Sequence, residues 1–428
     1  MKHEETIILG AGISGISAAF ELNKHKIGTL LLEKNKSWGG LLDNFTIDGF
    51  RFDKFIHLSF AQDDYVNNIF YKTPLINHQP LSYNYYKGCW LKHPAQNNLF
   101  PLNEVEKKLI LRDFKLRNLL GDEEVKNYEQ WLRCQFGDYF AENFSMIYTE
   151  KYWTIEAKNL ETKWIGNRLY KPSIEEVEKG SQTDITPNTY YAKEMRYPQK
   201  GGYKSFLKPM AEGLNIKTNS KVTAIDINKR QVVINGNLIK TYQNIISSLP
   251  LPEICKLIKN IPQHILEASK KLNYTSGYLI SLGFNKPHIA DKLWFYIYDK
   301  DILPSRVYSP SLKSSDNVPF GCSSIQAELY FNKGQKLNLS DEELLRQTIS
   351  KFINIGLFKE EDLIVKDIRT EKYANVIFDH FIYENRKIVL DYLEINKIIS
   401  IGRFGEWDYF WSDQSMLSGR NGALKIIN

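Results

Sequence analysis

The stretch Thr6-Ile7-Ile8-Leu9-Gly10-Ala11-Gly12-Ile13-Ser14-Gly15 decides the fold. Its first four residues form a short apolar run, as expected for a buried parallel strand, and the glycines follow at once. An amphipathic helix is predicted over residues 13–23, and a second apolar strand over Thr29–Leu32. This order of strand, glycine loop, helix and strand predicts a Rossmann-like dinucleotide-binding fold.

Each glycine in the loop has a physical role. Gly10 allows the tight turn, Gly12 lets the backbone approach a pyrophosphate, and Gly15 lets the helix pack closely on the strand. The helix N-terminus, at Ile13 and Ser14, supplies free N–H groups and a partial positive charge for phosphates. The loop is therefore predicted to bind the phosphates of a dinucleotide.

The segment after the second strand favours FAD over NAD. Glu33 ends that strand 18 residues after Gly15 and can accept hydrogen bonds from ribose hydroxyls. Lys34 and then Trp38-Gly39-Gly40-Leu41-Leu42 follow, which resembles the E-x(5)-G-G extension of FAD enzymes in the amine oxidase and UDP-galactopyranose mutase superfamily. In those enzymes the paired glycines let a loop backbone pass close to the cofactor, so FAD is the expected cofactor.

The rest of the chain predicts an α/β fold with a second, largely antiparallel sheet and a helical insertion. Helical periodicity is seen around 105–120, 123–136 and 140–152, and short strands are expected at 221–227, 231–234, 245–249, 278–284 and 293–298. A hairpin turn is predicted at Asp48–Asp53. The predicted segments are the three parts of an FAD-binding domain (1–80, 196–255 and 391–428), a sheet segment (81–103), a helical insertion (104–195) and an antiparallel sheet or substrate domain (256–390).

Composition and charge exclude several classes of protein. Hydrophobic residues make up 43% of the 428 residues and charged residues 25%, as in ordinary globular proteins. The net charge is +6, with the basic residues spread along the chain, so no nucleic-acid partner is expected. The four cysteines have no metal-ligand spacing, so no metal site is expected. Scattered thiols, no long apolar run and an early first strand predict a cytoplasmic protein without an integral membrane segment. Assembly into a homo-oligomer is left open.

Several separated segments together resemble the eukaryotic type of UDP-galactopyranose mutase. The matching segments are Gly88–Asn98 (family G-x-W-x-x-Y-P-F-Q-N-N), Trp153 and Trp164 with their spacing of 11, Arg196–Gly202 (F-R-F-P-x-x-G-G), Tyr296 and Arg306 with their spacing of 10, and Gly402–Tyr409 (G-R-F-G-S-W-x-Y). The resemblance covers most of the chain. It implies the FAD-binding fold of that family and its reaction.

In that family the six-membered ring of a UDP-linked sugar is converted to the five-membered ring, and N5 of reduced flavin acts as the nucleophile on the anomeric carbon. The resemblance thus implies reduced FAD, NAD(P)H as the external reductant, and a sugar-nucleotide substrate for surface polysaccharide biosynthesis. It assigns catalytic roles to His57, Arg306 and Arg403, since a guanidinium fork matches diphosphate oxygens. Substrate binding is assigned to Gln96, Trp153, Arg168, Tyr296 and Tyr409.

The expected FAD contacts come from both ends of the chain. They are Gly10, Gly12, Ile13, Ser14, Gly15, Glu33, Lys34, Gly39, Gly40, Leu41, His57, Val222, Gly402, Arg403, Gln414, Ser415 and Met416. Asp413 is expected to cap the last helix, whose N-terminus would then face the flavin.

This chain departs from the family pattern at several places, one of which is Ala95 in place of the Phe of P-F-Q. Phe55-Ile56-His57 stands where the family has Gly-Gly-His. One diphosphate tyrosine falls on Lys313, which could bind phosphate as a point charge, and another falls near Ile382, with Tyr383 adjacent. A sugar nucleotide other than UDP-galactose is therefore left open.

Two other function classes also remain open. A flavin oxidoreductase of the amine oxidase or protoporphyrinogen oxidase type would transfer a hydride to FAD and make peroxide, although the sequence shows no clear substitute for the aromatic cage and flavin-side lysine of amine oxidases. A non-catalytic FAD-bound scaffold would have no use for Arg306 and Arg403.

Overall fold

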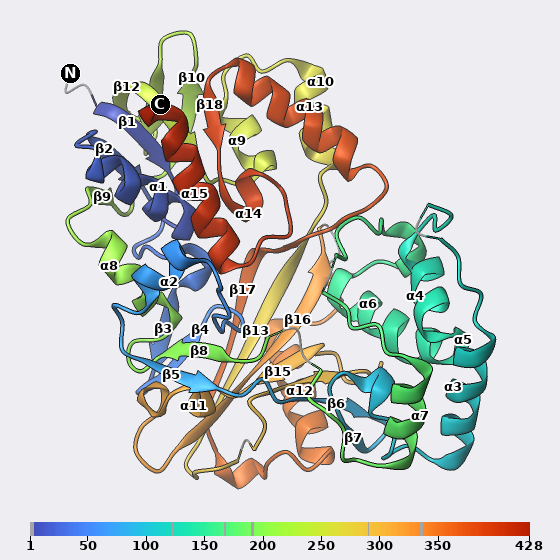
Figure 1. The fold of residues 1–428 in the computed structure, drawn as a ribbon. Coiled ribbons are helices and arrows are strands. Elements are labelled where there is room, and N and C mark those ends of the chain that lie inside the picture. The colour runs from blue at the N-terminus through green and yellow to red at the C-terminus, as the bar shows by residue number, and fades with distance from the viewer. Residues whose placement is uncertain (1–3, 122, 167, 190–191, 290, 334–336) are drawn as a thin grey trace.

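The computed structural model describes residues 4–121, 123–166, 168–189, 192–289, 291–333 and 337–428. Within them the chain forms two seven-stranded sheets, two small two-stranded sheets and helices that cover or flank them. Figure 1 shows the first sheet near both chain ends, the second sheet running down the middle of the molecule, and a group of helices to one side.

The first sheet is assembled from three distant parts of the chain. Its strands are β1 (Glu4–Leu9), β2 (Thr29–Leu32), β9 (Ile216–Lys217), β10 (Val222–Asp226), β11 (Gln231–Ile234), β12 (Leu238–Ser247) and β18 (Ile398–Ser400). The strand order is β10-β11-β12-β1-β2-β9, and β18 pairs with β12. β1 runs parallel to β2 and β12, and β18 runs parallel to β12. The carboxyl ends of these four strands therefore meet at one edge, where open α/β sheets bind ligands.

Helices α1 (Ile13–Lys24) and α15 (Ser412–Ile427) lie side by side against this sheet (Figure 1). A Cβ atom at Gly419 would lie 2.1 Å from the carbonyl oxygen of Ser14, and one at Gly15 would lie 2.0 Å from that of Gly10. The hydroxyl of Ser17 donates to the carbonyl of Met416 at 2.7 Å. Only glycine permits this approach, which joins the two ends of the chain.

The second sheet has the strand order β17-β13-β16-β15-β14-β6-β7. Its strands are β6 (Ser82–Tyr86), β7 (Cys89–Lys92), β13 (Tyr274–Phe284), β14 (Trp294–Ile297), β15 (Arg306–Tyr308), β16 (Ser323–Asn332) and β17 (Leu363–Val376). Its pairs are antiparallel except for β14 with β6. The hairpin β3 (Asn44–Ile47) with β4 (Phe50–Asp53) and the pair β5 (Leu75–His78) with β8 (Met195–Pro198) link the two large sheets.

The helical insertion lies at the right of Figure 1. It contains α3 (Glu104–Leu116), α4 (Tyr128–Phe136), α5 (Asp138–Phe140), α6 (Met146–Trp153) and α7 (Ile174–Gln182). Side chains of Asn103, Asn127 and Ser173 cap α3, α4 and α7, which is why these helices start where they do. Lys151 on α6 donates to the carbonyls of Ile297, Asp299 and Ile302 at 2.8, 2.9 and 2.8 Å, and so fixes the insertion to the second sheet.

The other helices connect these layers. They are α2 (Asp64–Phe70), α8 (Lys208–Ala211), α9 (Leu251–Leu257), α10 (Gln263–Lys271), α11 (Pro310–Lys313), α12 (Asp341–Asn354), α13 (Ile382–Ile395) and α14 (Gly402–Gly405). In the part of the chain described, no helix is both long and apolar enough to cross a membrane.

The predicted fold class is confirmed: a Rossmann-like first sheet, a largely antiparallel second sheet and a helical insertion are all present. The second insertion helix begins at Tyr128, five residues later than predicted, because Asn127 caps it. The predicted cap of the last helix was wrong. Trp411 is the N-cap, its backbone N–H donates to Oε1 of Gln414 at 2.9 Å, and Asp413 lies inside the first turn. The predicted segment limits stay predictions.

The contact between α1 and α15 gives a first prediction. Gly419→Ala should lower the free energy of unfolding by about 1–3 kcal/mol, because the added methyl group overlaps the Ser14 carbonyl and outweighs the better helix propensity of alanine. Urea unfolding measures the change. Asn421→Ala, at an exposed position of the same helix, is the control and should stay within about 0.5 kcal/mol of the wild type. Equal stability of the two variants would contradict the tight packing.

Candidate active site

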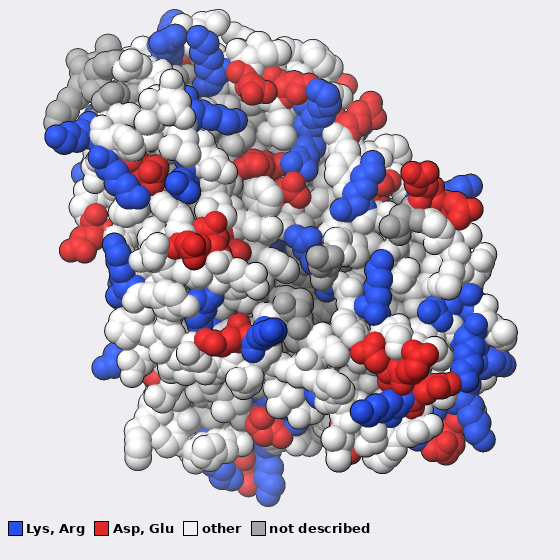
Figure 2. All heavy atoms as spheres, in the orientation of Figure 1, with Lys and Arg blue, Asp and Glu red and all other residues white. Residues whose placement is uncertain are grey.

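A cavity of about 1270 Å³ lies between the carboxyl edge of the first sheet, the second sheet and the helical insertion. Pockets for a single drug-sized ligand usually measure about 300–1,000 Å³, so this cavity has room for a dinucleotide and part of a second ligand. Figure 2 shows that Lys and Arg alternate with Asp and Glu over the face drawn, without a large field of one sign. The charges that matter for a ligand are therefore those inside the cavity.

One end of the cavity is built from glycine backbones. Gly12 forms a parallel bridge with Gly39, whose N–H donates to the carbonyl of Ala11 at 2.8 Å. A Cβ atom at Gly40 would lie 3.1 Å from Cα of Gly12, so side chains here would fill the space between the two loops. Gly12 is the N-cap of α1 and has no capping side chain, which leaves the first N–H groups of the helix available for phosphate oxygens.

Glu33 lies beside this glycine cradle at the end of β2. Its carboxylate accepts the backbone N–H groups of Ala11 at 3.1 Å and of Asn35 at 2.9 Å. These bonds hold the acid in place at the cavity wall, where Lys34 and Val222 also lie. The arrangement suits an adenosine ribose, for which the sequence predicts this acid.

Most of the predicted cofactor residues line the cavity. They are Gly10, Gly12, Ile13, Ser14, Glu33, Lys34, Gly39, Gly40, Leu41, His57, Val222, Gly402, Arg403 and Ser415. Gly15, Gln414 and Met416 are not among the lining residues. Gly15 packs on the loop, Gln414 holds the start of α15, and Met416 is buried in the core. The flavin contacts of all these residues stay predictions.

The residues assigned to catalysis and substrate binding line the same cavity. They are His57, Gln96, Trp153, Arg168, Tyr296, Arg306, Arg403 and Tyr409. They come from the loop after β4, the turn after β7, the second sheet, the helical insertion and the C-terminal segment, so the fold brings together side chains that are far apart in sequence.

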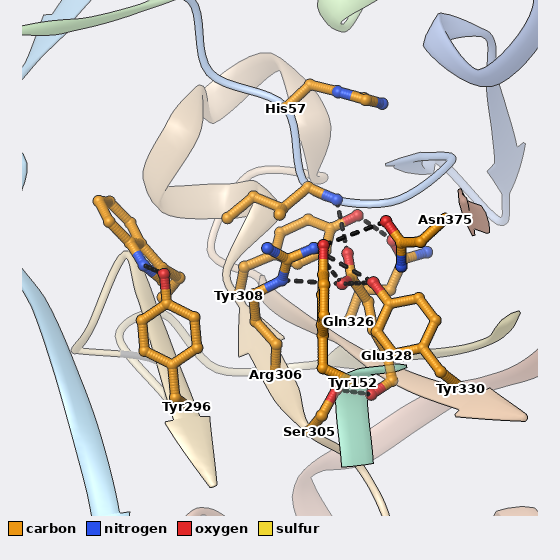
Figure 3. Close-up of polar contacts among 12 residues, drawn as sticks. His57, Tyr152, Tyr296, Ser305, Arg306, Tyr308, Gln326, Glu328, Tyr330 and Asn375 are labelled. Atoms are coloured by element: carbon orange, nitrogen blue, oxygen red, sulfur yellow. Dashed lines mark hydrogen bonds and ion pairs between the residues drawn. The ribbon is translucent and has the colours of Figure 1, made fainter. Parts of the chain in front are cut away.

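Arg306 on β15 forms an ion pair with Glu328, which lies opposite it on β16. Its Nε and Nη2 lie 2.8 and 2.5 Å from Oε2 of Glu328 (Figure 3). Glu328 is fully buried and also accepts the hydroxyl of Tyr330 and the backbone N–H of Ile56, each at 2.6 Å. The protein therefore largely neutralises the charge of Arg306.

Arg403 has a different environment, because its partners are neutral. Nη2 donates to Oδ1 of Asn375 at 2.8 Å and Nη1 to the carbonyl of Phe410 at 3.1 Å. The guanidinium also lies 4.8 Å from the ring centre of Tyr409. No carboxylate among the described residues forms an ion pair with Arg403. Its charge therefore remains available to an anionic ligand.

Tyr152, on α6 of the insertion, lies between the two arginines. Its hydroxyl lies 3.1 Å from Oδ1 of Asn375 and 3.3 Å from the hydroxyl of Tyr409, and the Arg306 guanidinium lies 5.8 Å from its ring centre. Burial raises the pKa values of Tyr148, Tyr152 and Tyr330 well above their usual range. These hydroxyls thus stay protonated and can donate hydrogen bonds.

The remaining candidates are held by local contacts. Arg168 donates to the carbonyls of Trp164 and Tyr409 at 3.0 and 2.8 Å, and its guanidinium stacks near the rings of Tyr409 and Trp411. Gln96 donates to the carbonyl of Tyr170 at 2.9 Å. The hydroxyl of Tyr296 accepts a hydrogen bond from Trp294 at 3.2 Å.

His57 lies apart from the Arg306 cluster in Figure 3. Its Nε2 is 3.0 Å from the carbonyl of Leu41 and 2.9 Å from that of Lys54, so Nε2 carries the hydrogen and Nδ1 is the acceptor. Burial lowers the pKa of His57 to about 4, although nearby Asp53 favours the charged form. His57 is therefore neutral at physiological pH.

Phe55 has a backbone conformation that glycine adopts more readily than other residues. Its φ angle is +65°, in the left-handed region. The ring stacks on Tyr330 with 6.0 Å between ring centres, and it occupies the space beside Gly277, where a Cβ atom would lie 2.6 Å from the ring. The absence of a side chain at Gly277 in β13 therefore makes room for the Phe55 ring.

Two expectations about the replaced tyrosines were wrong. Lys313 does not line the cavity. It is fully buried and pairs with Asp53 at 2.7 Å. Ile382 and Tyr383 lie in α13 and do not line the cavity either. Asn375, Tyr152 and Tyr330 line the cavity instead, and Glu328 pairs with Arg306. No motif surrounds these residues, so the sequence does not single them out; for those on β16 and β17, alternation along the strand is the only signal.

No group of three or more metal-binding side chains occurs within the residues that the structure describes.

Comparison with known proteins shows which proteins share this fold. A family model described as an NAD(P)-binding Rossmann-like domain matches residues 8–72. A solved structure of reduced UDP-galactopyranose mutase is similar over 99% of this chain and 95% of that chain, with 23% identity and a TM-score of 0.92.

Two oxidase structures are also similar over nearly their full length. A candidate protoporphyrinogen oxidase from Exiguobacterium sp. 255-15 has 14% identity and a TM-score of 0.75, covering 100% of this chain and 99% of that chain. Wild-type putrescine oxidase with bound putrescine has 16% identity and a TM-score of 0.69, with the same coverage. The chain thus has the fold shared by this mutase and these oxidases. Of the three, the UDP-galactopyranose mutase has the highest TM-score.

The buried ion pair yields a second prediction. Glu328→Gln should lower the free energy of unfolding by about 3 kcal/mol, because it leaves the mostly buried Arg306 without a counter-charge. Chemical denaturation measures this. Glu343→Gln breaks the exposed pair with Arg346 and should change stability by less than about 1 kcal/mol. A Glu328→Gln protein as stable as Glu343→Gln would contradict the assignment.

His57 yields a prediction about pH. Its folded pKa of about 4 lies below the ordinary value of 6.5, so between these values the unfolded chain binds more protons. Stability should therefore fall as the pH drops from about 6.5 to about 4, with His57 contributing up to about 3 kcal/mol of the loss. His57→Gln should show a correspondingly smaller loss over this range in denaturation experiments. Exposed His264→Gln should follow the wild type; if His57→Gln does so too, His57 does not have this depressed pKa.

Proposed function

We propose that this chain is an FAD-dependent enzyme that interconverts the six- and five-membered ring forms of a sugar nucleotide, as UDP-galactopyranose mutase does. The observation that carries the proposal is that Arg306 and Arg403 face the same cavity as the Gly10–Gly15 loop, with Tyr152 between them. Such a reaction takes place in the cytoplasm, before a surface polysaccharide is assembled.

FAD fits the residues at the glycine end of the cavity. The bare N-terminus of α1 and the close approach of Gly12 to Gly40 suit the pyrophosphate, and Glu33 suits the ribose. Reduced FAD, with NAD(P)H as the external reductant, would supply the nucleophile for the anomeric carbon. The protein has to bind the sugar nucleotide, orient it and stabilise the departing diphosphate.

The two arginines have unequal roles in this proposal. Arg403 lacks a carboxylate partner among the described residues, so its full charge acts on the departing diphosphate. Arg306 is held rigid by Glu328 and offers Nη1, which forms no hydrogen bond to the described residues. Arg306 therefore orients an oxygen atom of the diphosphate and adds little net positive charge.

The other residues assigned to the site complete the polar lining. The hydroxyls of Tyr296 and Tyr409 are assigned as donors to the phosphates, and Gln96, Trp153 and Arg168 to the nucleotide and sugar sides. His57 acts as a neutral acceptor through Nδ1, since its depressed pKa makes it a poor proton donor at physiological pH. The aromatic walls exclude water, which strengthens each of these interactions.

The alternative is a flavin oxidoreductase that takes a hydride from its substrate and reduces oxygen to peroxide. The similarity to the candidate protoporphyrinogen oxidase and to putrescine oxidase favours it. An amine substrate would need a free carboxylate in the cavity, but the lining residues Glu33, Glu253 and Glu371 already have protein partners. Arg403, in contrast, has no carboxylate partner among the described residues. This favours an anionic substrate over a cationic one.

Product analysis tests the proposal. Anaerobic protein reduced with dithionite should convert UDP-galactofuranose to UDP-galactopyranose, whereas oxidised protein should not. Chromatography of the two sugar nucleotides measures the conversion. Arg403→Ala should reduce kcat/KM by about 10- to 100-fold, because hydrogen bonds between charged groups contribute about 1.5–3 kcal/mol. Bound FAD should remain.

Arg346→Ala, which removes an exposed arginine on α12, is the matched control and should keep wild-type activity. Other sugar nucleotides are assayed in the same way. Peroxide release from an amine or a protoporphyrinogen, without ring conversion of any sugar nucleotide, would overturn the mutase assignment in favour of the oxidoreductase.

A further inference from the structure

One face of α6, together with the turn before it, lies along the cavity. A π-helical turn over Ala141–Ser145 directly precedes α6, and such turns are rare and occur frequently at functional sites. The sequence assigns a role to Trp153 of this face but none to Tyr148. The residues of the face line the cavity at spacings of three and four, as expected for one side of a helix: Ser145, Tyr148, Thr149, Tyr152 and Trp153.

The ring of Tyr148 is held by three other tyrosines. It packs edge-on against Tyr296 with 5.4 Å between ring centres, stacks on Tyr152 at 5.7 Å and lies 5.8 Å from the ring of Tyr298. Contacts on three sides leave the ring little freedom to turn. Its hydroxyl is therefore positioned before a ligand binds, which lowers the entropy cost of binding.

Tyr148 faces the same part of the cavity as Arg306. Tyr296 lies directly opposite Arg306 in the pairing of β14 with β15, so both side chains are on one face of the sheet. The Arg306 guanidinium lies 5.8 Å from the ring centre of Tyr152. Figure 3 shows Arg306 between these two tyrosines, and Tyr148 packs against both of them.

The charge of Arg306 also reaches the Tyr148 hydroxyl. Burial raises the pKa of Tyr148 well above its usual range, and the nearby Arg306 lowers it in part. The hydroxyl therefore stays protonated and is a hydrogen-bond donor beside a guanidinium.

The hydroxyl of Tyr148 has no hydrogen-bond partner among the described residues. Those of Tyr152 and Tyr330, in contrast, are bonded to Asn375 and Glu328. Tyr148 is half-buried, and its oxygen is not among the unpaired side-chain atoms that are fully buried. Nη1 of Arg306 is not among them either. Both donors therefore keep surface that a ligand oxygen in the cavity can reach.

A phosphate oxygen suits two such donors. It has more than one lone pair, so a guanidinium N–H and a phenol O–H can donate to it from two directions, and hydrogen bonds to a charged acceptor are the strong ones. Arg306 is largely neutralised by Glu328 and binds an anion less strongly than a free arginine would. A second donor from Tyr148 would raise the affinity for phosphate without a further charge.

We propose that Tyr148 is a substrate-binding residue whose hydroxyl donates to the same diphosphate oxygen as Nη1 of Arg306. The inference rests on the proposed function for the diphosphate, but it concerns binding rather than the reaction. Through Tyr148 the helical insertion takes part in recognising the phosphates.

Titration of UDP and of inorganic pyrophosphate into the FAD-loaded protein tests this, with flavin fluorescence or calorimetry as the readout. Tyr148→Phe keeps the ring among its three neighbours and removes only the hydroxyl. It should weaken binding of both ligands by about tenfold or more, with bound FAD and Tm unchanged. Tyr139→Phe, in the same insertion but outside the cavity, is the matched control and should bind both ligands like the wild type.

A double variant tests whether the two donors share one oxygen. Arg306→Lys keeps a positive charge opposite Glu328 but removes Nη1. It should weaken binding of both ligands. Adding Tyr148→Phe to Arg306→Lys should then weaken binding by only about threefold or less, because groups that hold the same atom have non-additive effects.

Binding by Tyr148→Phe within about twofold of the wild type would overturn the inference, as would additive effects of the two changes or loss of FAD from Tyr148→Phe. If the wild type binds neither UDP nor pyrophosphate, the inference and the proposed function both fail. If both ligands bind as expected but no sugar nucleotide is converted, only the proposed function fails.

Discussion

Close backbone contact around Ser14 is the constraint on which the rest of the structure depends. A Cβ atom at Gly402 would lie 2.2 Å from Oγ of Ser14, and one at Gly419 would lie 2.1 Å from its carbonyl oxygen. The N-terminal loop and the C-terminal segment can thus meet only because glycine stands at both positions. Their meeting brings Arg403 to the cavity that begins at the glycine cradle, and it leaves the start of α1 open to a ligand.

The helical insertion also contacts distant parts of the chain, but it does so through hydrogen bonds between polar groups. Lys151 donates to three carbonyls in β14 and the loop that follows it, and the next residue, Tyr152, reaches Asn375. Adjacent residues of α6 therefore make one structural contact and one contact within the site. Any movement of the insertion would change both the anchoring and the donors that face a ligand.

Local pattern was enough to predict the dinucleotide-binding end, because a strand, three glycines and an acid must follow one another within a few residues. The resemblance to the mutase family, rather than local pattern, gave Arg306, Arg403 and Tyr296, and all three line one cavity. Local pattern could not give Glu328 or Asn375, because their importance arises from strands that pair across long separations. Lys313 shows the opposite error: alignment with a tyrosine position suggested a phosphate ligand, whereas Asp53 holds it in the core.

The loop at Phe55 and Ile56 is joined to the second sheet and to the ion pair of Arg306. Phe55 adopts a left-handed backbone, and Gly277 on β13 vacates the volume that its ring needs. Ile56 then donates its N–H to Glu328, the carboxylate that neutralises Arg306. The altered loop is therefore coupled to the charge balance of the site. Because Glu328 is satisfied by the loop and by Arg306, it offers nothing to a cationic ligand, and Arg403 is left as the arginine whose charge only an anion can balance.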